Sequence, residues 1–420
     1  MVGLSDLNRS LTEQDVADVL RQVFNDLPVN GKRLLVLIPD GTRHAPIPIL
    51  FRKLHELIGK QATRLDYLIA LGTHPAMTPD AVDRLVGMSA PERAQRYPHT
   101  AIFNHTWDRT DSLVHIGTIA GAEIDELSGG LMQKPISVEL NKLILDYDQL
   151  VICGPVFPHE VAGFSGGAKY IFPGIAGPEV INATHWLGAM GTSIRTIGIK
   201  DTAVRRVIHR AAELVPKPIL CIALVVRDAE LHGIFAGDHI EAWSSAADVS
   251  ALLRIKRVPN GFRRVLAMPS PIYDDLWTAA KAMYKTEPAV ADGGEIIIYQ
   301  PDLHEISYTH GKLIDEIGYH VLEYFTSQTE RFASVPGMIT AHSTHVKGSG
   351  SYDSSSRNEQ PRIQVTLATG IPKERCLRVN LGYLDPQSVD PAAWEGREAE
   401  GVLVVRNAGE MLFRADDVSG

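Results

Sequence analysis

Residues 150–177 read LVICGPVFPHEVAGFSGGAKYIFPGIAG and contain the strongest indication of how this chain folds. The run from Leu150 to Val156 is apolar, as expected of a strand that is covered on both faces. It leads into a small-residue turn at 163–168, where glycines allow the backbone to approach a ligand closely. A buried strand followed by such a turn is typical of an α/β sheet that binds a ligand at the carboxyl ends of its strands.

Short apolar runs alternate with helical segments around this stretch. Runs rich in valine, isoleucine and leucine predict buried strands, and the segments between them have helical spacing. This alternation predicts an α/β domain with a mainly parallel sheet. The expected strands are Arg33–Pro39, Leu65–Leu71, Leu150–Val156 and Ile219–Val226, and the expected helices are Pro48–Ile58, Pro79–Val86 and Asp201–Leu214.

The pattern breaks at Arg257–Arg264, where proline, asparagine and glycine lie among three arginines and predict a hinge or linker. A second α/β unit follows, and Val402–Phe413 is expected to form a hairpin that returns to the first domain. We therefore expect two α/β domains around a central cleft, one formed by residues 1–256 plus 400–420 and one by residues 264–398. In the second unit we expect strands at Val265–Met268 and Glu295–Tyr299, helices near Asp274–Met283 and Leu313–Ser327, and a Gly/Ser-rich loop at Lys347–Ser356.

Composition excludes several classes of protein. A length of 420 residues exceeds what one hydrophobic core usually organises, which agrees with two domains. The net charge of −9 gives no basic surface for nucleic acid. Three widely spaced cysteines do not form a disulfide scaffold or a structural zinc site. No signal peptide or membrane-spanning run is evident, so we expect a cytoplasmic protein without nucleic-acid or membrane partners.

Polar loops follow two of the predicted strands. The loop DGTR at 40–43 could bind an anion or phosphate through Arg43 and backbone amides, with Asp40 orienting the arginine. Read alone, it is more readily a tight turn with a surface ion pair. The loop GTHP at 72–75 places His74 where an imidazole could act as a general acid or base, although a histidine at a helix entry is the simpler interpretation.

The third loop is harder to explain structurally. His159 and Lys169 flank a glycine-rich turn, and His185 lies sixteen residues after the lysine. Lysine can act as a nucleophile, and imidazole suits nickel, copper, iron or zinc. This combination suits a cofactor that is covalently tethered or that contains a metal or a phosphate. His185 could also be a core histidine beside Trp186.

One helix of the second unit has a similar ambiguity. Trp277, Thr278 and Lys281 lie within about one helical turn of each other and could receive a small molecule that carries a carboxylate. A solvent-facing start of an amphipathic helix explains them equally well. A mobile, solvated loop is expected further on, at His342, His345 and Lys347.

Taken in order, DGTR, GTH, the block PHEVAGFSGGAK at 158–169, His185 and Lys281 resemble the family of nickel-dependent lactate racemases and related 2-hydroxyacid racemases and epimerases. The resemblance covers most of the chain, and the region 158–185 is its most specific part. It implies a nickel-pincer nucleotide, a pyridinium-3,5-bisthiocarboxylic acid mononucleotide that carries nickel through carbon and sulfur atoms. It also implies two α/β domains around a cleft.

The same resemblance implies roles for individual residues. Lys169 would hold the cofactor covalently, and His185 would supply the fourth ligand of nickel. His74 and His159 correspond to two acid/base histidines, while Arg43 and Lys281 would handle the carboxylate of the substrate. Further residues expected at the cofactor are Asp40, Gly41, Thr42, Ser165, Gly166 and Gly167, and further residues expected at the substrate are Trp277 and Thr278.

The implied chemistry avoids a costly dianion. A base removes the hydroxyl proton while hydride leaves C2, and a planar 2-ketoacid results. Return of hydride to the opposite face inverts the centre, so one base is needed on each side. The implied partners are a small 2-hydroxyacid and cofactor-maturation proteins. The sequence leaves the oligomeric state open, a homo-oligomer included.

The sequence departs from the family at Trp277 and Thr278, where lactate racemase has a tyrosine and a substrate-binding glutamine. We therefore expect a substrate other than lactate, such as a larger or more polar 2-hydroxyacid or a sugar acid. Two other hypotheses remain open. One is a metal-dependent hydrolase or lyase that uses the three histidines, and the other is a nucleotide- or metal-binding carrier protein.

Overall fold

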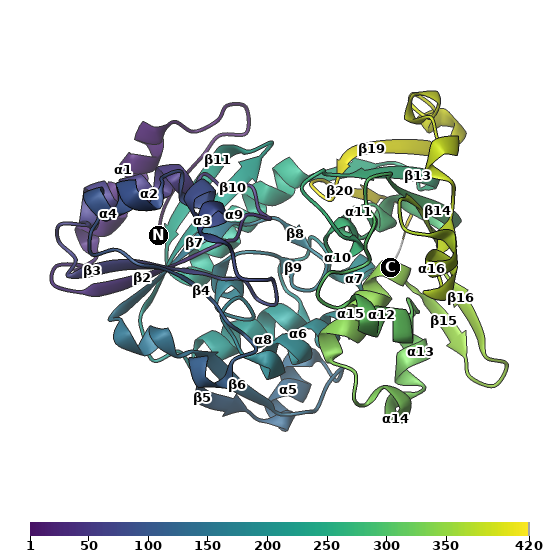
Figure 1. Ribbon diagram of the computed structural model, residues 1–420, viewed down its shortest axis with the longest axis horizontal. Helices are drawn as coiled ribbons and strands as arrows, with labels where there is room; N and C mark the ends of the chain where they lie inside the picture. The colour runs from purple at the N-terminus through teal and green to yellow at the C-terminus, as the bar shows by residue number, and fades with distance from the viewer. Residues whose placement is uncertain (419–420) are drawn as a thin grey trace. The chain divides into compact units, whose positions relative to one another are not determined.

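The computed structural model describes residues 1–418, and the chain divides into two compact units (Figure 1). The first unit comprises Met1–Phe157, Phe164–Ile181 and Arg205–Leu253. The second comprises Pro158–Gly163, Asn182–Val204 and the chain from Arg254 onward. The expected mixed α/β class is confirmed. The glycine-rich region contributes segments to both units, which the domain boundaries expected from the sequence do not include.

The first unit is built on a seven-stranded sheet in the order β1-β11-β10-β7-β2-β3-β4. The strands from β10 to β4 are parallel, while β11 and β1 are antiparallel to their neighbours. All four strands expected in this region are present. The strands are β1 (Val2–Ser5), β2 (Arg33–Ile38), β3 (Arg64–Ile69), β4 (Ile102–Asn104), β7 (Gln149–Pro155), β10 (Ile219–Arg227) and β11 (Glu230–Gly237).

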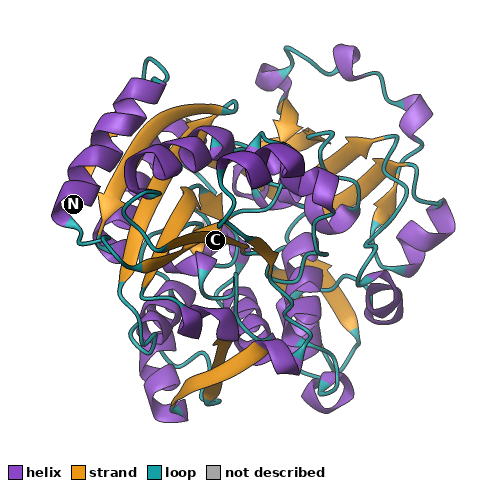
Figure 2. Cartoon of the chain, turned by 60° about the vertical axis from the view of Figure 1, so that its left-hand side comes forward, coloured by secondary structure: helices purple, strands orange, loops and turns teal. Residues whose placement is uncertain are grey.

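Helices cover both faces of this sheet (Figures 1 and 2). The expected helices correspond to α2, α3 and α8. The segments in this part of the chain are α1 (Glu13–Asp26), α2 (Ile47–Ile58), α3 (Pro79–Val86), α4 (Ala90–Arg96), α5 (Gly121–Ser128), α6 (Pro178–Met190), α7 (Ser193–Thr196), α8 (Ala203–Ala212) and α9 (His239–Arg254), with the short strands β5 (Leu113–Ile119), β6 (Ile136–Asn141), β8 (Pro158–His159) and β9 (Gly163–Phe164).

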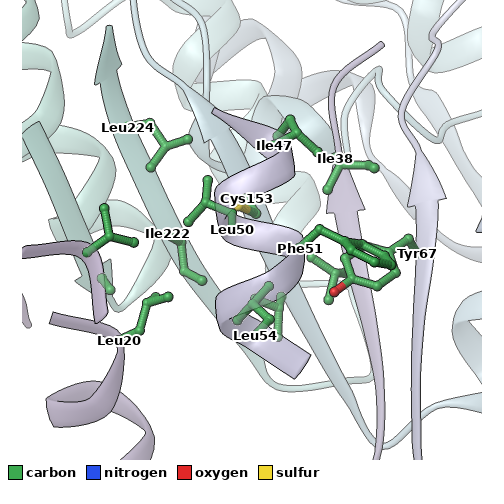
Figure 3. Close-up of a cluster of buried hydrophobic side chains, with 14 of the residues drawn as sticks. Leu20, Ile38, Ile47, Leu50, Phe51, Leu54, Tyr67, Cys153, Ile222 and Leu224 are labelled. Carbon is green, nitrogen blue, oxygen red and sulfur yellow. The ribbon is translucent and has the colours of Figure 1, made fainter. Parts of the chain in front are cut away.

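The core of the first unit lies between α1, α2 and the sheet. Leu50 and Leu54 of α2 point at the strands, where Ile38, Tyr67 and Ile222 are buried with them (Figure 3). Burying one such aliphatic side chain contributes about 1.5–3 kcal/mol, so this layer fixes the sheet to the helices. The sheet in turn fixes the loops that leave its strands.

The second unit contains a five-stranded sheet in the order β18-β17-β14-β13-β19, and all its pairings are parallel. Its strands are β13 (Phe262–Pro269), β14 (Val290–Gln300), β17 (Gln364–Thr369), β18 (Gly382–Tyr383) and β19 (Val402–Ala408), beside the pairs β12 (Ile255–Val258) with β20 (Leu412–Ala415) and β15 (Gly350–Asp353) with β16 (Asn358–Pro361). Its helices are α10 (Leu276–Ala279), α11 (Lys281–Tyr284), α12 (Gly311–Ile317), α13 (Leu322–Thr326), α14 (Thr329–Phe332), α15 (Gly337–Lys347) and α16 (Lys373–Arg378).

The C-terminal segment differs from our expectation. The strand β19 pairs with β13, and β20 pairs with β12, so the two do not form a hairpin with each other. The segment therefore completes the second unit and does not return to the first. The physical reason is the edge of β13, whose backbone groups would otherwise lack ladder partners. The expected linker at 257–264 instead lies within the second unit, between β12 and β13.

Two other expectations are refined by the structure. The single helices expected at 274–283 and 313–327 are each two shorter helices, and Gly318, with φ of +73°, ends the first helix of the second pair. The three cysteines are buried and free, as expected. Within residues 1–418, no helix is long and apolar enough to cross a membrane.

We predict a pH-dependent stability that involves His55 in α2. Burial lowers the pKa of this imidazole to about 4, whereas an unperturbed histidine has a pKa of about 6.5. The unfolded chain therefore binds the proton more readily, and stability is lost as the pH falls from about 6.5 towards 4. In His55→Leu, we expect the free energy of unfolding to fall less steeply, by up to about 1.4 kcal/mol per pH unit. Urea unfolding at a series of pH values measures this slope, and equal slopes would contradict the prediction.

Candidate active site

The first unit brings three polar loops to one edge of its sheet. Because β7, β2 and β3 are parallel neighbours, their carboxyl ends point the same way. Asp40 follows β2, His74 follows β3, and the glycine-rich region follows β7. The loops also contact one another. The backbone N–H of Gly72 donates to the carbonyl of Gly174 at 2.9 Å, and the guanidinium of Arg43 lies 5.6 Å from the ring centroid of Phe157.

Asp40 and His74 form the central contact at this edge. The Oδ2 atom of Asp40 contacts Nδ1 of His74. The Oδ1 atom accepts hydrogen bonds from the backbone N–H of Thr42 at 3.0 Å and from its hydroxyl at 2.6 Å. Burial raises the pKa of Asp40, but His74, Arg43 and the Thr42 hydroxyl together lower it well below its usual range. The ionised carboxylate therefore holds a proton on Nδ1 and leaves Nε2 of His74 for proton transfer.

Arg43 is positioned differently from our expectation. Its Nη1 donates to the hydroxyl and carbonyl oxygens of Thr42, at 2.9 and 3.1 Å, and no hydrogen bond joins it to Asp40. Asp40 thus orients the arginine only through Thr42. Most of the side chain's donors remain for an anion, because only Nη1 is used in these contacts.

Buried side chains hold the backbone of the glycine-rich turn in place through hydrogen bonds. The hydroxyl of Ser165 accepts from the Phe157 N–H at 2.9 Å and donates to the Pro155 carbonyl at 3.1 Å. The indole of Trp243 donates to the Ser165 carbonyl at 2.8 Å. Ser165 therefore uses the hydrogen of its hydroxyl within the protein, where it helps to shape the turn.

Arg205 also binds the backbone of this turn. Its guanidinium donates to the carbonyl of Gly166 at 3.2 Å and to that of Phe164, and it lies 4.2 Å from the ring centroid of Trp243. The side chain is only 1% exposed. Burial lowers the pKa of Arg205 to about 9. A buried guanidinium is costly unless its hydrogen-bonding groups are matched, so these contacts fix the shape of the turn.

Lys169 lies at the end of the glycine-rich turn. The preceding glycines have positive φ angles, +76° at Gly166 and +58° at Gly167. A Cβ atom at Gly167 would lie 2.9 Å from Cβ of Trp243, so internal packing alone requires glycine there. The backbone N–H of Lys169 donates to the Gly166 carbonyl at 3.2 Å. The half-buried amine is thus presented from a rigid short helix, Gly167–Tyr170.

The second unit contains the other predicted acid/base histidine, His159. Its imidazole is 7% exposed, and Nδ1 accepts the backbone N–H of Val161 at 3.1 Å. Because a backbone N–H can only donate, the neutral ring carries its proton on Nε2. The carboxylate of Glu160 lies 3.5 Å from the same Nδ1. His159 therefore has the opposite tautomer from His74, and its Nε2–H is a hydrogen-bond donor where Nε2 of His74 is an acceptor.

His185 and the predicted substrate helix lie in the same unit as His159. His185 is half-buried on α6. The hydroxyl of Thr278 donates back to its own helix start, where Oδ1 of Asp275 lies at 2.9 Å. The Nζ atom of Lys281 lies 4.3 Å from the ring centroid of Tyr273, a cation–π contact. Trp277, Thr278 and Lys281 are half-buried, so this helix start is neither fully exposed to solvent nor fully buried in the core.

The expectation of a solvated loop at His342, His345 and Lys347 is wrong. All three lie on α15, in which every residue from Met338 to Lys347 is buried. A helix that is buried on all sides has no polar face, and its sequence therefore lacks amphipathic periodicity. The ring of His342 lies 4.0 Å from that of Trp277, and burial moves the pKa of His342 well below its usual range, with contributions from His345, His310 and His185.

Comparisons with known proteins find similarity to lactate racemases. Residues 9–198 match the model of the lactate racemase N-terminal domain. A lactate racemase from Thermoanaerobacterium thermosaccharolyticum is 27% identical over 279 residues, which are 66% of this chain and 61% of that protein. A lactate racemase from Lactiplantibacillus plantarum is 26% identical over 275 residues, which are 64% and 60% of the two chains. The N-terminal part of the chain is thus similar to the lactate racemase N-terminal domain.

Solved structures extend the likeness over nearly the whole chain. A protein from Thermotoga maritima has a TM-score of 0.88 and 28% identity, and the match covers 98% of this chain and 100% of that one. The lactate racemase apoprotein from T. thermosaccharolyticum has a TM-score of 0.71 and 20% identity, covering 96% and 93%. The second match shows a shared fold. In sequence, by contrast, the chain spans only about three fifths of the curated lactate racemases, 61% and 60%.

Several residues of this candidate site were not identified from the sequence. Arg205 and Trp243 brace the turn from α8 and α9, and His310 and His342 flank Trp277. Arginine in an amphipathic helix normally faces solvent, so the sequence around Arg205 did not indicate that this residue is buried. A histidine-rich helix, with His342 and His345 one turn apart, was the one signal that could have indicated a site.

We predict that Asp40→Asn changes the tautomer of His74. The amide can donate to Nδ1, which favours a proton on Nε2 and removes the lone pair needed for base catalysis. Two-bond ¹⁵N–¹H correlations on the apoprotein report the tautomer, and turnover by the loaded enzyme should fall about 10²–10⁴-fold. The exposed carboxylate of Asp80 provides a control through Asp80→Asn. An unchanged His74 tautomer in Asp40→Asn would contradict the assignment.

Proposed function

We propose that this protein is a racemase or epimerase that inverts C2 of a 2-hydroxyacid and uses a nickel-pincer nucleotide tethered to Lys169. The observation that carries the proposal is the Asp40–His74 pair, which prepares an imidazole for proton transfer at the sheet edge that also presents Lys169. Similarity to the lactate racemase N-terminal domain and to a lactate racemase gives the reaction class its first support. The preferred substrate is proposed to differ from lactate.

The donor groups of the described residues are compatible with this cofactor. Lys169 is a half-buried amine on a rigid turn, suited to a covalent bond, and the loop at 40–43 offers Arg43 to a phosphate or carboxylate. Among residues 1–418, no group of three or more histidine, cysteine or acidic side chains could hold a metal ion. A cofactor that brings its own carbon and sulfur ligands needs one imidazole from the protein, which is the role proposed for His185.

In this proposal the protein binds, orients and moves protons. Arg43 and Lys281 hold the carboxylate of the substrate, so that C2 and its hydroxyl take a fixed orientation. His74 accepts the hydroxyl proton from one enantiomer, and His159 donates a proton to form the hydroxyl of the other. The reverse direction exchanges these roles. When bound, the cofactor supplies the acceptor and donor of hydride at C2.

A two-base inversion needs one neutral imidazole as the base and one imidazolium as the acid at the start of each turnover. The Asp40 carboxylate keeps a proton on Nδ1 of His74 and leaves Nε2 as the base. His159 donates a proton only as the imidazolium, in which Nδ1 would release the Val161 N–H and donate to the Glu160 carboxylate, 3.5 Å away. No observation favours the hydrolase, which would use His74, His159 and His185 on one ion, or the carrier protein. Cofactor-maturation proteins remain the proposed partners.

Intact-mass spectrometry tests the covalent tether. We expect protein produced together with cofactor-maturation enzymes to carry an added mass on Lys169, because its amine is the proposed nucleophile. Lys169→Ala and the charge-preserving Lys169→Arg should both lack the added mass while retaining the wild-type fold by circular dichroism. A variant that keeps the full adduct would remove Lys169 from this role.

Racemisation assays on a panel of 2-hydroxyacids test the reaction. We expect His74→Ala and His159→Ala each to lower turnover about 10²–10⁴-fold, because each removes one proton-transfer group. His44→Ala is a matched control, since His44 is an exposed histidine of the loop that follows β2. Inversion of lactate faster than every other acid would refute the substrate preference, and no inversion of any acid by loaded protein would refute the function.

A further inference from the structure

Buried rings surround Trp277 in the second unit. The indole lies 4.6 Å from the ring of His310 and 4.0 Å from that of His342, measured between ring centroids. His342 is 7% exposed. Its Nδ1 lies 3.0 Å from the hydroxyl of Tyr284, which fixes the orientation of the imidazole. Its other nitrogen, Nε2, has no hydrogen-bond partner among residues 1–418.

An unmatched buried nitrogen of this kind calls for an explanation. Buried polar groups are nearly always hydrogen-bonded, and exceptions are explained by strain, by a catalytic role, or by a bound water or ion. His342 is close enough to His185, the proposed nickel ligand, to interact with it electrostatically. It also packs on Trp277, which we expect at the substrate. The unmatched nitrogen thus lies among the residues of the proposed site that belong to this unit.

The hydroxyl of Thr278, next to Trp277 in sequence, is already engaged. It donates its hydrogen to Asp275, whose Oδ1 and carbonyl oxygen lie at 2.9 and 3.1 Å. Lys281 is the cation of this helix pair and suits the carboxylate of a substrate. Asp275 is a buried carboxylate that would repel a second negative charge. Of the two imidazoles that flank Trp277, His342 is the one whose Nε2 atom has no hydrogen-bond partner within residues 1–418, so it is the polar atom that we assign to a substituent on C2.

We propose that the substrate is a 2-hydroxyacid that carries a further hydroxyl on C3 or beyond, and that His342 Nε2 binds this hydroxyl. The inference rests on the proposed function. A hydroxyl both donates and accepts, so it matches either tautomer of His342. An alkyl substituent would leave the nitrogen unmatched, and a second carboxylate would need a cation that these residues do not provide.

Pairs of acids that differ only in hydroxylation test the proposal with loaded enzyme. Glycerate is paired with lactate, and 2,3,4-trihydroxybutanoate is paired with 2-hydroxybutanoate. We expect kcat/KM to be at least about tenfold higher for the hydroxylated member of at least one pair, because a site built for a hydroxyl discriminates strongly against its absence. Equal values, or a preference for the alkyl member in both pairs, would overturn the inference.

Variants assign the preference to His342. His342→Phe keeps a ring against Trp277 and removes the nitrogen, so the ratio of kcat/KM between the hydroxylated and the alkyl member should fall at least about tenfold. His342→Gln keeps a polar group and should retain part of the preference. His342→Leu replaces the phenylalanine variant if that one does not fold. His55→Leu, which removes a buried imidazole in the other unit with an unmatched Nε2, is the matched control and should keep the wild-type ratio.

These outcomes separate the inference from the function on which it rests. If loaded enzyme inverts none of the four acids or any other 2-hydroxyacid, the proposed function fails. If it inverts them without a preference for the hydroxylated members, only the inference fails. If the preference is present but unchanged in the His342 variants, the assignment to Nε2 is wrong.

Discussion

The contact between the Asp40 carboxylate and the His74 imidazole is the constraint on which the proposed chemistry depends. It joins loops from two adjacent strands, and it exists because β2 and β3 are parallel and in register, with Ile38 opposite Ile69. A shift of one residue would turn every side chain of a strand to the other face. The hydrophobic layer beneath α2 prevents such a shift, so packing in the core determines the tautomer of one histidine.

Buried side chains also position functional groups in the glycine-rich turn and in the second unit. Arg205 and Trp243 hold the carbonyls of the turn, so Lys169 is presented from a fixed backbone. In the second unit, the hydroxyl of Tyr284 lies 3.0 Å from Nδ1 of His342 and orients its imidazole. In both places a buried side chain without a direct chemical role sets the position of one that has it, as is usual for preorganised sites.

Sequence reasoning succeeded where local composition determines the structure. The strand predicted at Arg33–Pro39 is present as Arg33–Ile38, because a strand buried on both faces is a continuous apolar run. The class of the fold followed from their alternation with helices. Reasoning failed where the outcome depends on distant partners. Helix α15 lacks periodicity because it is buried on all sides, Arg205 is buried by carbonyls 39 and 41 residues away, and β19 joins β13 across a long sequence separation.

Retention of the hydrogen at C2 tests the central claim most directly. Loaded enzyme would be given a 2-hydroxyacid deuterated at C2 in ordinary water, and the inverted product would be analysed by mass spectrometry or NMR. The account predicts that deuterium is retained, because the hydrogen leaves and returns as hydride while the histidines exchange only the hydroxyl proton. Loss of deuterium to solvent at the rate of inversion would show proton abstraction from carbon and would contradict it.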